Sequence, residues 1–171
     1  MTTNKLCCTL AVCVIMCLGL AALIQAQDKL VNQVCLGCLC EAVSGCNQTR
    51  ACGGGACGLF HITRAYWADG GKLTLNNESP QSEEAFANCV NDPYCAADTI
   101  QNYMTKFGQD CNGDGIVDCY DYAAIHKLGG FGCKGELTQQ YKTSLDECIK
   151  AHSNIDDNQC AEKLIKASEK A

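Results

Sequence analysis

The sequence predicts a mainly helical, disulfide-rich α+β domain, and three observations support this prediction. Several segments between residues 82 and 130 repeat apolar residues at the spacing of an α-helix. The chain of 171 residues contains 17 cysteines, a density typical of secreted proteins reinforced by disulfides. Once an apolar N-terminal segment is set aside, 145 residues remain, which is a normal length for one domain.

The first 26 residues have the three parts of a secretory signal peptide. A basic start with Lys5 precedes an uncharged apolar stretch from Leu6 to Ile24, and the small residue Ala26 offers a cleavage point. The apolar stretch also approaches the length of a membrane span, so a signal anchor is the alternative. We expect cleavage after Ala26 and therefore a secreted, extracellular protein with no membrane association after signal removal.

Thirteen cysteines follow this segment, and in a secreted chain they predict a disulfide framework. Zinc is the alternative because Cys35, Cys38 and Cys40 are closely spaced, but no paired histidines follow. The cysteines expected in disulfides are Cys35, Cys38, Cys40, Cys46, Cys52, Cys57, Cys89, Cys95, Cys111, Cys119, Cys133 and Cys148. Thirteen is odd, so one thiol is free or pairs with another chain, and the pairing cannot be read from sequence.

The elements are expected in the following order. Residues 58–72 contain aromatic residues interrupted by glycines and are predicted to be strand-like or irregular. One helix is predicted from a capping Ser82, a second from Cys95 to Gly108, and a third from Asp121 to the glycines at 129 and 130. The Lys/Glu/Asp-rich stretch from 144 to 171 is predicted to be helical. The domain is then expected to span residues 27–148, with a polar tail at 149–171.

Charge and modification motifs narrow the possible partners. The chain beyond residue 26 carries 12 basic and 19 acidic residues, a net charge of −7, which disfavours nucleic acid as a partner. Asn47 and Asn77 each begin an N-glycosylation sequon, as is common in secreted proteins.

Several motifs in order resemble the invertebrate-type lysozymes, also called destabilase-type lysozymes. They are CLGCLCEAVSGC at 35–46, CGLFHITRAYW at 57–67, the Cys89 and Cys95 pair, DCNGDGIVDCYDYAAIHKLGGFGC at 110–133, and Cys148. The resemblance implies a lysozyme-like fold with a sugar-binding cleft and a muramidase that acts on peptidoglycan. In some members it also implies isopeptidase activity.

The groups that would carry the chemistry are missing. The family's general acid, a glutamate, falls on Val43, which has no proton to give. Glu41 lies two residues away, which on a helix turns a side chain by about 200° and points it elsewhere. The second carboxylate falls between Cys52 and Cys57, where only GGGA remains. Glycoside hydrolysis ordinarily needs two carboxyl groups across the scissile bond, so we expect no muramidase activity.

Two further departures accompany this loss. A family lysine falls on Thr63, and a family cysteine falls on Gly70, which would account for the odd cysteine count. Cys160, outside the matched region, is either its substitute or a separate addition.

A binding cleft is still expected. Tyr66 and the single tryptophan, Trp67, offer flat faces for sugar rings, although a lone tryptophan in a small domain often belongs to the core. His126 and Asp69 are given cleft positions by the resemblance. Glu41 and Asp69 are the weak candidates for a relocated catalytic pair.

The segment DCNGDGIVDCYD at 110–121 matches the spacing of a calcium loop. The expected ligands are the side chains of Asp110, Asn112, Asp114, Asp118 and Asp121 and the main-chain carbonyl of Ile116. Cys111 and Cys119 inside the loop offer the alternative that disulfides hold the same turn unaided. No cofactor is required for function, and calcium would be structural.

The sequence therefore predicts a lysozyme-like pseudo-enzyme that binds bacterial cell-wall glycan or a related polysaccharide. A working hydrolase with relocated residues is one alternative. A calcium-stabilised extracellular interaction module is another.

Overall fold

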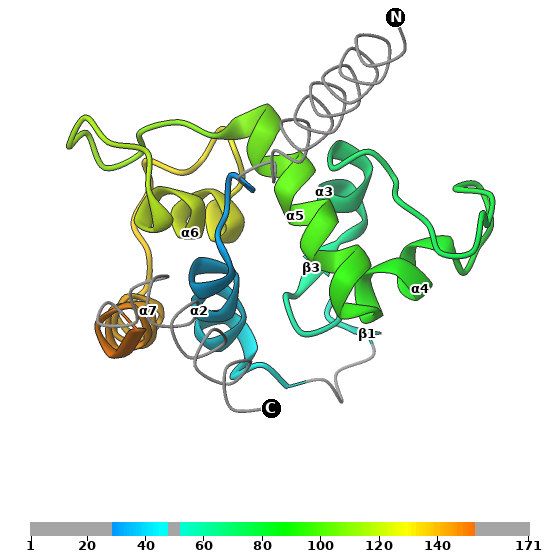
Figure 1. The fold of residues 1–171 in the computed structure, drawn as a ribbon, viewed down its shortest axis with the longest axis horizontal. Coiled ribbons are helices and arrows are strands. Elements are labelled where there is room, and N and C mark those ends of the chain that lie inside the picture. The colour runs from blue at the N-terminus through cyan, green and yellow to red at the C-terminus, as the bar shows by residue number, and fades with distance from the viewer. Residues whose placement is uncertain (1–28, 48–51, 153–171) are drawn as a thin grey trace, which may run out of the picture.

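The computed structural model describes residues 29–47 and 52–152, which form a mainly helical α+β domain. The signal segment, Cys160 and the tail beyond His152 lie outside the described residues. The elements in order are α2 (Gln33–Ser44), β1 (Cys52–Gly53), β2 (Ala56–Cys57), β3 (Ile62–Thr63), α3 (Arg64–Asp69), α4 (Ala85–Asn91), α5 (Pro93–Phe107), α6 (Cys119–Leu128) and α7 (Gln139–His152). Figure 1 shows α5 crossing the middle of the domain, with α2, α6 and α7 on one side and α3 and α4 on the other.

Local capping explains where the principal helices begin. The Asn32 side chain accepts a hydrogen bond from the Cys35 N–H at 2.8 Å and starts α2. Asp92 does the same for α5, where Pro93 occupies the first helical position and has no N–H to satisfy. A capping box formed by Asp118 and Asp121 starts α6 two residues before the predicted start at Asp121.

Two of the predicted elements are wrong in part. The helix expected from Ser82 begins at Ala85, because the Ser82 hydroxyl donates to the Glu78 carboxylate instead of capping a helix. The segment expected to be strand-like contains only the two residues of β3 before it becomes α3. Thr63 starts that helix by accepting a hydrogen bond from the Tyr66 N–H at 3.2 Å. The family lysine position thus holds a helix cap.

The C-terminal helix was also predicted to begin too late. It starts at Gln139, five residues before the predicted start at Ser144, and runs through the proposed domain boundary at 148 to His152. Tyr141 and Leu145 are buried, and the Tyr141 hydroxyl donates to the Ala123 carbonyl of α6 at 3.1 Å. This part of the helix belongs to the domain.

The three two-residue strands form a small antiparallel sheet in the order β1-β2-β3. Cys52 pairs with Cys57, and Ala56 pairs with Thr63. The sheet carries the loop after α2 back toward α3, so it places Ala56 near the start of that helix.

Trp67 belongs to the core and is only 2% exposed. Its ring packs edge-on against Phe86 with centroids 5.7 Å apart, and its Nε1–H donates to the Leu73 carbonyl at 2.8 Å. Because both its faces and its polar atom are occupied, the predicted role of Trp67 in sugar binding is wrong.

Six disulfides hold the domain, and they use all twelve cysteines of the described residues. The pairs are Cys35–Cys119, Cys38–Cys148, Cys40–Cys46, Cys52–Cys57, Cys89–Cys95 and Cys111–Cys133. The first joins α2 to α6 and the second joins α2 to α7. Because the closely spaced cysteines of α2 are all bonded to sulfur, they offer no thiolate to zinc.

Gly70 ends α3 against α5. A Cβ atom placed there would lie 2.7 Å from the Thr99 carbonyl oxygen and 2.8 Å from the Thr99 methyl carbon. The close approach of the two helices explains why this position, where the resemblance places a cysteine, carries no side chain. Within residues 29–47 and 52–152, we find no helix with the length and apolar character needed to cross a membrane.

Candidate functional site

A cleft of about 450 Å³ lies where the end of α2, the small sheet, α3 and α6 meet. We call it the His126 cleft. Its lining residues are Val43, Ala56, Phe60, His61, Thr63, Ala65, Tyr66, Asp69, Tyr103, His126, Lys127, Leu128 and Gly129. Three of the predicted cleft residues, Tyr66, Asp69 and His126, therefore lie together.

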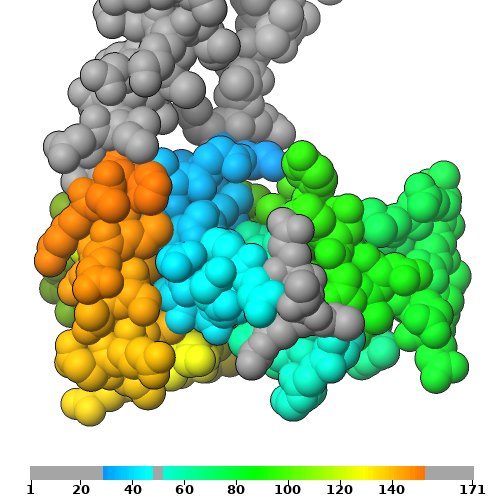
Figure 2. Space-filling view, turned by 90° about the horizontal axis from the view of Figure 1, so that it is seen from below, coloured from blue at the N-terminus to red at the C-terminus, as the bar shows by residue number. Residues whose placement is uncertain are grey.

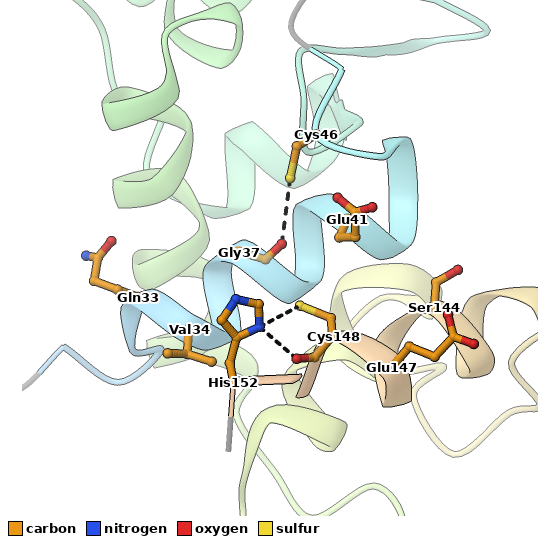
Figure 3. A pocket seen from close by; sticks show the side chains of 9 residues that line it. All are labelled: Gln33, Val34, Gly37, Glu41, Cys46, Ser144, Glu147, Cys148 and His152. Carbon is orange, nitrogen blue, oxygen red and sulfur yellow. Dashed lines mark hydrogen bonds between the residues drawn. The ribbon is translucent and has the colours of Figure 1, made fainter. Parts of the chain in front are cut away.

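The two sides of α2 face different hollows. Val43 lines the His126 cleft, whereas Glu41 lines a separate pocket of about 660 Å³ between α2 and α7. Figure 2 shows α7 lying along one side of α2 and of the segment that follows it. Figure 3 shows Glu41 on α2 and Glu147 and His152 on α7 around this α2–α7 pocket. Glu41 and Asp69 thus line different hollows and do not form a pair across one substrate.

His126 is fixed by hydrogen bonds at both ring nitrogens. Nε2 lies 2.9 Å from the Phe60 carbonyl oxygen, and Nδ1 lies 3.2 Å from the Tyr66 hydroxyl. A carbonyl oxygen can only accept, so Nε2 carries the proton and Nδ1 accepts from Tyr66. The ring thus has no free nitrogen with which to take a proton from a substrate.

The surroundings of His126 also keep it neutral. Burial, with smaller repulsions from Lys127 and His61, lowers the pKa of His126 to about 4. Burial likewise raises the pKa of Tyr66 well above its ordinary value, so its hydroxyl remains a donor at neutral pH. These two residues form a fixed polar wall of the cleft.

Asp69 is the carboxylate of the cleft, and it is already paired. Its Oδ1 lies 2.6 Å from Lys106 Nζ, and both side chains are about half exposed. An exposed pair of this kind holds its geometry at little net gain in stability. Asp69 and Lys106 together present a donor and an acceptor at the rim of the cleft.

Two further residues, Ala56 and Ser44, lie close to Val43 or in the lining of the cleft. Ala56 stands in the cleft on the side where the short GGGA loop returns, and it brings only a methyl group. Ser44, next to Val43, donates its hydroxyl to the Leu59 carbonyl at 2.5 Å and accepts from the Asn47 N–H at 3.3 Å. No general base lies within hydrogen-bond reach of that hydroxyl among the partners found in the described residues.

The predicted calcium loop uses its carboxylates as acceptors for backbone N–H groups. Asp110 accepts from Gly113 and Gly115 at 2.6 and 2.9 Å, and these bonds lower the pKa of its carboxyl group. Asp121 is fully buried and accepts from the N–H groups of Cys111 and Asp118, both at 2.8–2.9 Å. The loop is therefore satisfied by its own backbone.

The other expected calcium ligands are engaged in the same way. Asp114 accepts from the Ile116 N–H and from the Asn112 side chain, both at 2.9 Å, and Asp118 accepts from the Tyr120 N–H at 2.8 Å. In the part of the chain that the structure describes, one group of His, Cys, Asp or Glu brings its ligand atoms within 4.8 Å, and it is Cys38, Cys148 and His152. Its two sulfurs form a disulfide and offer no thiolate to a metal, and calcium binding by residues 110–121 stays a prediction.

Both sequon asparagines are exposed. Asn77 lies in a turn between α3 and α4, where its backbone has a φ of 60°. Asn47 lies three residues after Ser44, the last residue of α2. Occupancy of the two sequons stays a prediction.

Sequence reasoning missed three contributors to the cleft. Tyr103 and Lys106 come from α5, and the Phe60 carbonyl comes from the segment between β2 and β3. Tyr103 carries the helical spacing of a core residue, and its ring stacks on Tyr66 with centroids 3.6 Å apart. No local signal links Lys106 to Asp69, because the two residues are 37 positions apart.

Comparison with known proteins agrees with this geometry. The sequence model of the family described as Destabilase matches residues 32–148. The chain is similar to invertebrate-type lysozyme 3 of Caenorhabditis elegans, with 32% identity over 67% of this chain and 84% of the relative. It is also similar to a lysozyme of Meretrix lusoria, with 32% identity over 72% of this chain and 94% of the relative.

The chain is also similar to a solved structure. The crystal structure of Aeromonas hydrophila PliI in complex with Meretrix lusoria lysozyme aligns with a TM-score of 0.55 at 32% sequence identity. The alignment covers 68% of this chain and 89% of the matched one.

Proposed function

Because this chain belongs to the destabilase family of invertebrate-type lysozymes, we propose that it is a secreted protein that binds bacterial cell-wall glycan without cleaving it. The observation that carries the proposal is Val43 in the His126 cleft, at the position where the resemblance places the general acid. Glu41 cannot take over, because it lines the α2–α7 pocket instead. The cleft keeps the means to hold a sugar and lacks the acid to break a glycosidic bond.

The binding half of the proposal rests on fixed polar groups beside apolar surface. The Tyr66–His126 pair and the Asp69–Lys106 pair line a cleft that also contains Phe60 and Ala56. Sugar hydroxyls suit such paired donors and acceptors, while the C–H faces of the rings suit the apolar walls. Preformed groups of this kind bind with little loss of side-chain entropy.

The second half of the proposal, that the glycan is not cleaved, rests on the carboxylates missing from the cleft. General acid assistance is worth about a hundred- to ten-thousandfold in rate. A second carboxylate would support the oxocarbenium-like transition state. The cleft has one carboxylate, Asp69, and a lysine neutralises it. Neither the acid nor its partner is in place.

Binding is tested with insoluble peptidoglycan and a matched pair of variants. Asp69→Ala removes the ion pair of the cleft, whereas Asp98→Ala removes an equally exposed pair with Lys29 outside it. We expect the wild type and Asp98→Ala to sediment with peptidoglycan and Asp69→Ala to sediment severalfold less. Equal sedimentation of the two variants would show that the cleft does not bind the glycan.

Catalysis is tested by turbidity clearing of cell walls. We expect no clearing by the wild type and at most weak clearing by Val43→Glu, because the other carboxylate of the cleft, Asp69, is paired with Lys106. Adding Ala56→Asp to Val43→Glu supplies a further carboxylate on the side of the GGGA loop and should raise the rate above either single variant. The proposal would be overturned if the wild type cleared cell walls and Glu41→Gln abolished that clearing. Glu147→Gln, in the same α2–α7 pocket, is the control and should then leave clearing unchanged.

A further inference from the structure

Phe131 is an aromatic side chain held out into solvent by a fixed loop. It is 96% exposed and lies between Gly130 and Gly132, two residues before the Cys111–Cys133 disulfide. The loop is anchored on both sides of Gly130. Its N–H donates to the Tyr103 hydroxyl at 3.2 Å, and its carbonyl accepts from the Gln109 side chain at 2.6 Å.

The loop is also packed closely against α5. A Cβ atom on Gly130 would lie 2.3 Å from the ring of Phe107, so that ring rests directly on the backbone of the loop. Phe107 in turn meets Phe131 edge-on, with ring centroids 5.4 Å apart. A single exposed aromatic residue is ordinary, but the backbone that carries Phe131 is fixed by hydrogen bonds and a nearby disulfide.

Phe131 is the outer end of a row of rings that starts in the His126 cleft. Tyr66 and Tyr103 both line the cleft and stack at 3.6 Å. Tyr103 then contacts Phe107 at 4.5 Å, and Phe107 contacts Phe131 at 5.4 Å. Tyr66 and Tyr103 are themselves buried, so the rings that offer surface beside the cleft are the partly exposed Phe107 and the exposed Phe131.

Polar groups run beside this row. Lys106 Nζ lies 2.6 Å from Asp69 at the cleft rim and 4.9 Å from the centre of the Phe107 ring. A chain of sugars that leaves the cleft past Asp69 would meet this ion pair first and then the rings of Phe107 and Phe131.

We propose that Phe131 forms an outer sugar-binding position, which stacks on one further pyranose ring of a linear glycan whose preceding sugars occupy the His126 cleft. This inference rests on the proposed function, because it needs a glycan in the cleft. Among the other exposed aromatics, Tyr94 is 81% exposed but lines a different hollow, between α2 and α5. Tyr94 is therefore a control for exposure without continuity.

The test compares short and long oligosaccharides by calorimetric titration. Chitotriose and chitohexaose are the probes, because both are soluble chains of N-acetylglucosamine. We expect the wild type and Tyr94→Ala to prefer the hexaose. Phe131→Ala should lose about two- to tenfold in affinity for the hexaose and little for the triose, as expected for one aromatic contact. Phe131→Trp should restore the preference.

The outcomes separate the two proposals. A hexaose preference that Phe131→Ala leaves unchanged would overturn the outer position and leave the binding cleft in place. A wild type that binds neither oligosaccharide nor peptidoglycan would overturn both. Because Phe131 is almost fully exposed, unchanged thermal midpoints of its variants serve as the check on folding.

Discussion

The disulfide between α2 and α7 should contribute more to stability than its local surroundings suggest. Cys38 and Cys148 are 110 positions apart, and a loop of that length would stabilise the fold by about 5 kcal/mol through the entropy of the unfolded chain. The Cys35–Cys119 disulfide already shortens this loop. With that bond intact, the path from Cys38 to Cys148 contains roughly 30 residues, and the expected contribution falls to about 4 kcal/mol.

The perturbation is the double substitution Cys38→Ala and Cys148→Ala, which leaves no unpaired thiol behind. It should lower the thermal midpoint by roughly 10 °C in a domain of this size. The matched control is Cys52→Ala with Cys57→Ala, because that disulfide closes a separation of only 5 positions. The same entropy argument gives the control about 2 kcal/mol.

The assay is unfolding followed by circular dichroism in the absence of reductant, with hydrogen exchange in α7 as a second measurement. Tyr141 and Leu145 still dock the helix, so protection in α7 should fall without disappearing. Equal losses in the two double variants, or a larger loss for Cys52→Ala with Cys57→Ala, would refute the loop-entropy reasoning.

Three further predictions concern groups at the edges of the domain. Backbone hydrogen bonds hold the pKa of Asp110 below its ordinary value, so the stability it contributes is present above about pH 4 and is lost as the pH falls through its lowered pKa. The difference in thermal midpoint between the wild type and Asp110→Asn should therefore be seen at pH 6 and shrink toward pH 2, and a constant difference would contradict this. Because the carboxylates of residues 110–121 already accept N–H groups, millimolar calcium should raise the thermal midpoint of unfolding by no more than about 1 °C. A rise of several degrees that is lost in Asp114→Asn would instead establish a calcium site. The twelve cysteines of residues 29–47 and 52–152 are paired. Alkylation of native protein prepared without residues 1–26 should therefore label Cys160 alone or reveal a dimer that Cys160→Ser abolishes; labelling of any other cysteine would contradict the pairing.

The principal helices could be predicted because their signals are local. The glycines after α5 and α6 act within a turn of the helix they end. The start of α5 was predicted two residues late, at Cys95, because the Asp92 cap and Pro93 at the first helical position were not used. Ser82 misled the prediction, because its hydroxyl has a competing partner in Glu78 four residues earlier. The six-residue α3 was missed, since it is too short for an apolar period to show.

The cleft could be predicted only in part, because its contacts are distant in sequence. The resemblance located Asp69 and His126, yet the Phe60 carbonyl that fixes the His126 tautomer is 66 positions away. The partition of Glu41 and Val43 between two hollows followed from helical geometry alone and agrees with the lining of each. The folded arrangement of α2, α5, α6 and α7 decides which cysteines pair and which aromatic ring is exposed. Neither could be predicted from the sequence.

The tight contact between Gly70 and Thr99 also limits which residues position 70 can hold. A cysteine placed there would bring its Cβ atom against the backbone carbonyl oxygen of Thr99 on α5, so the substitution should destabilise the domain. Trimming the Thr99 side chain would not relieve the contact with its carbonyl oxygen, and α5 itself would have to shift first. Engineering a disulfide at this position therefore means moving a helix rather than changing one side chain.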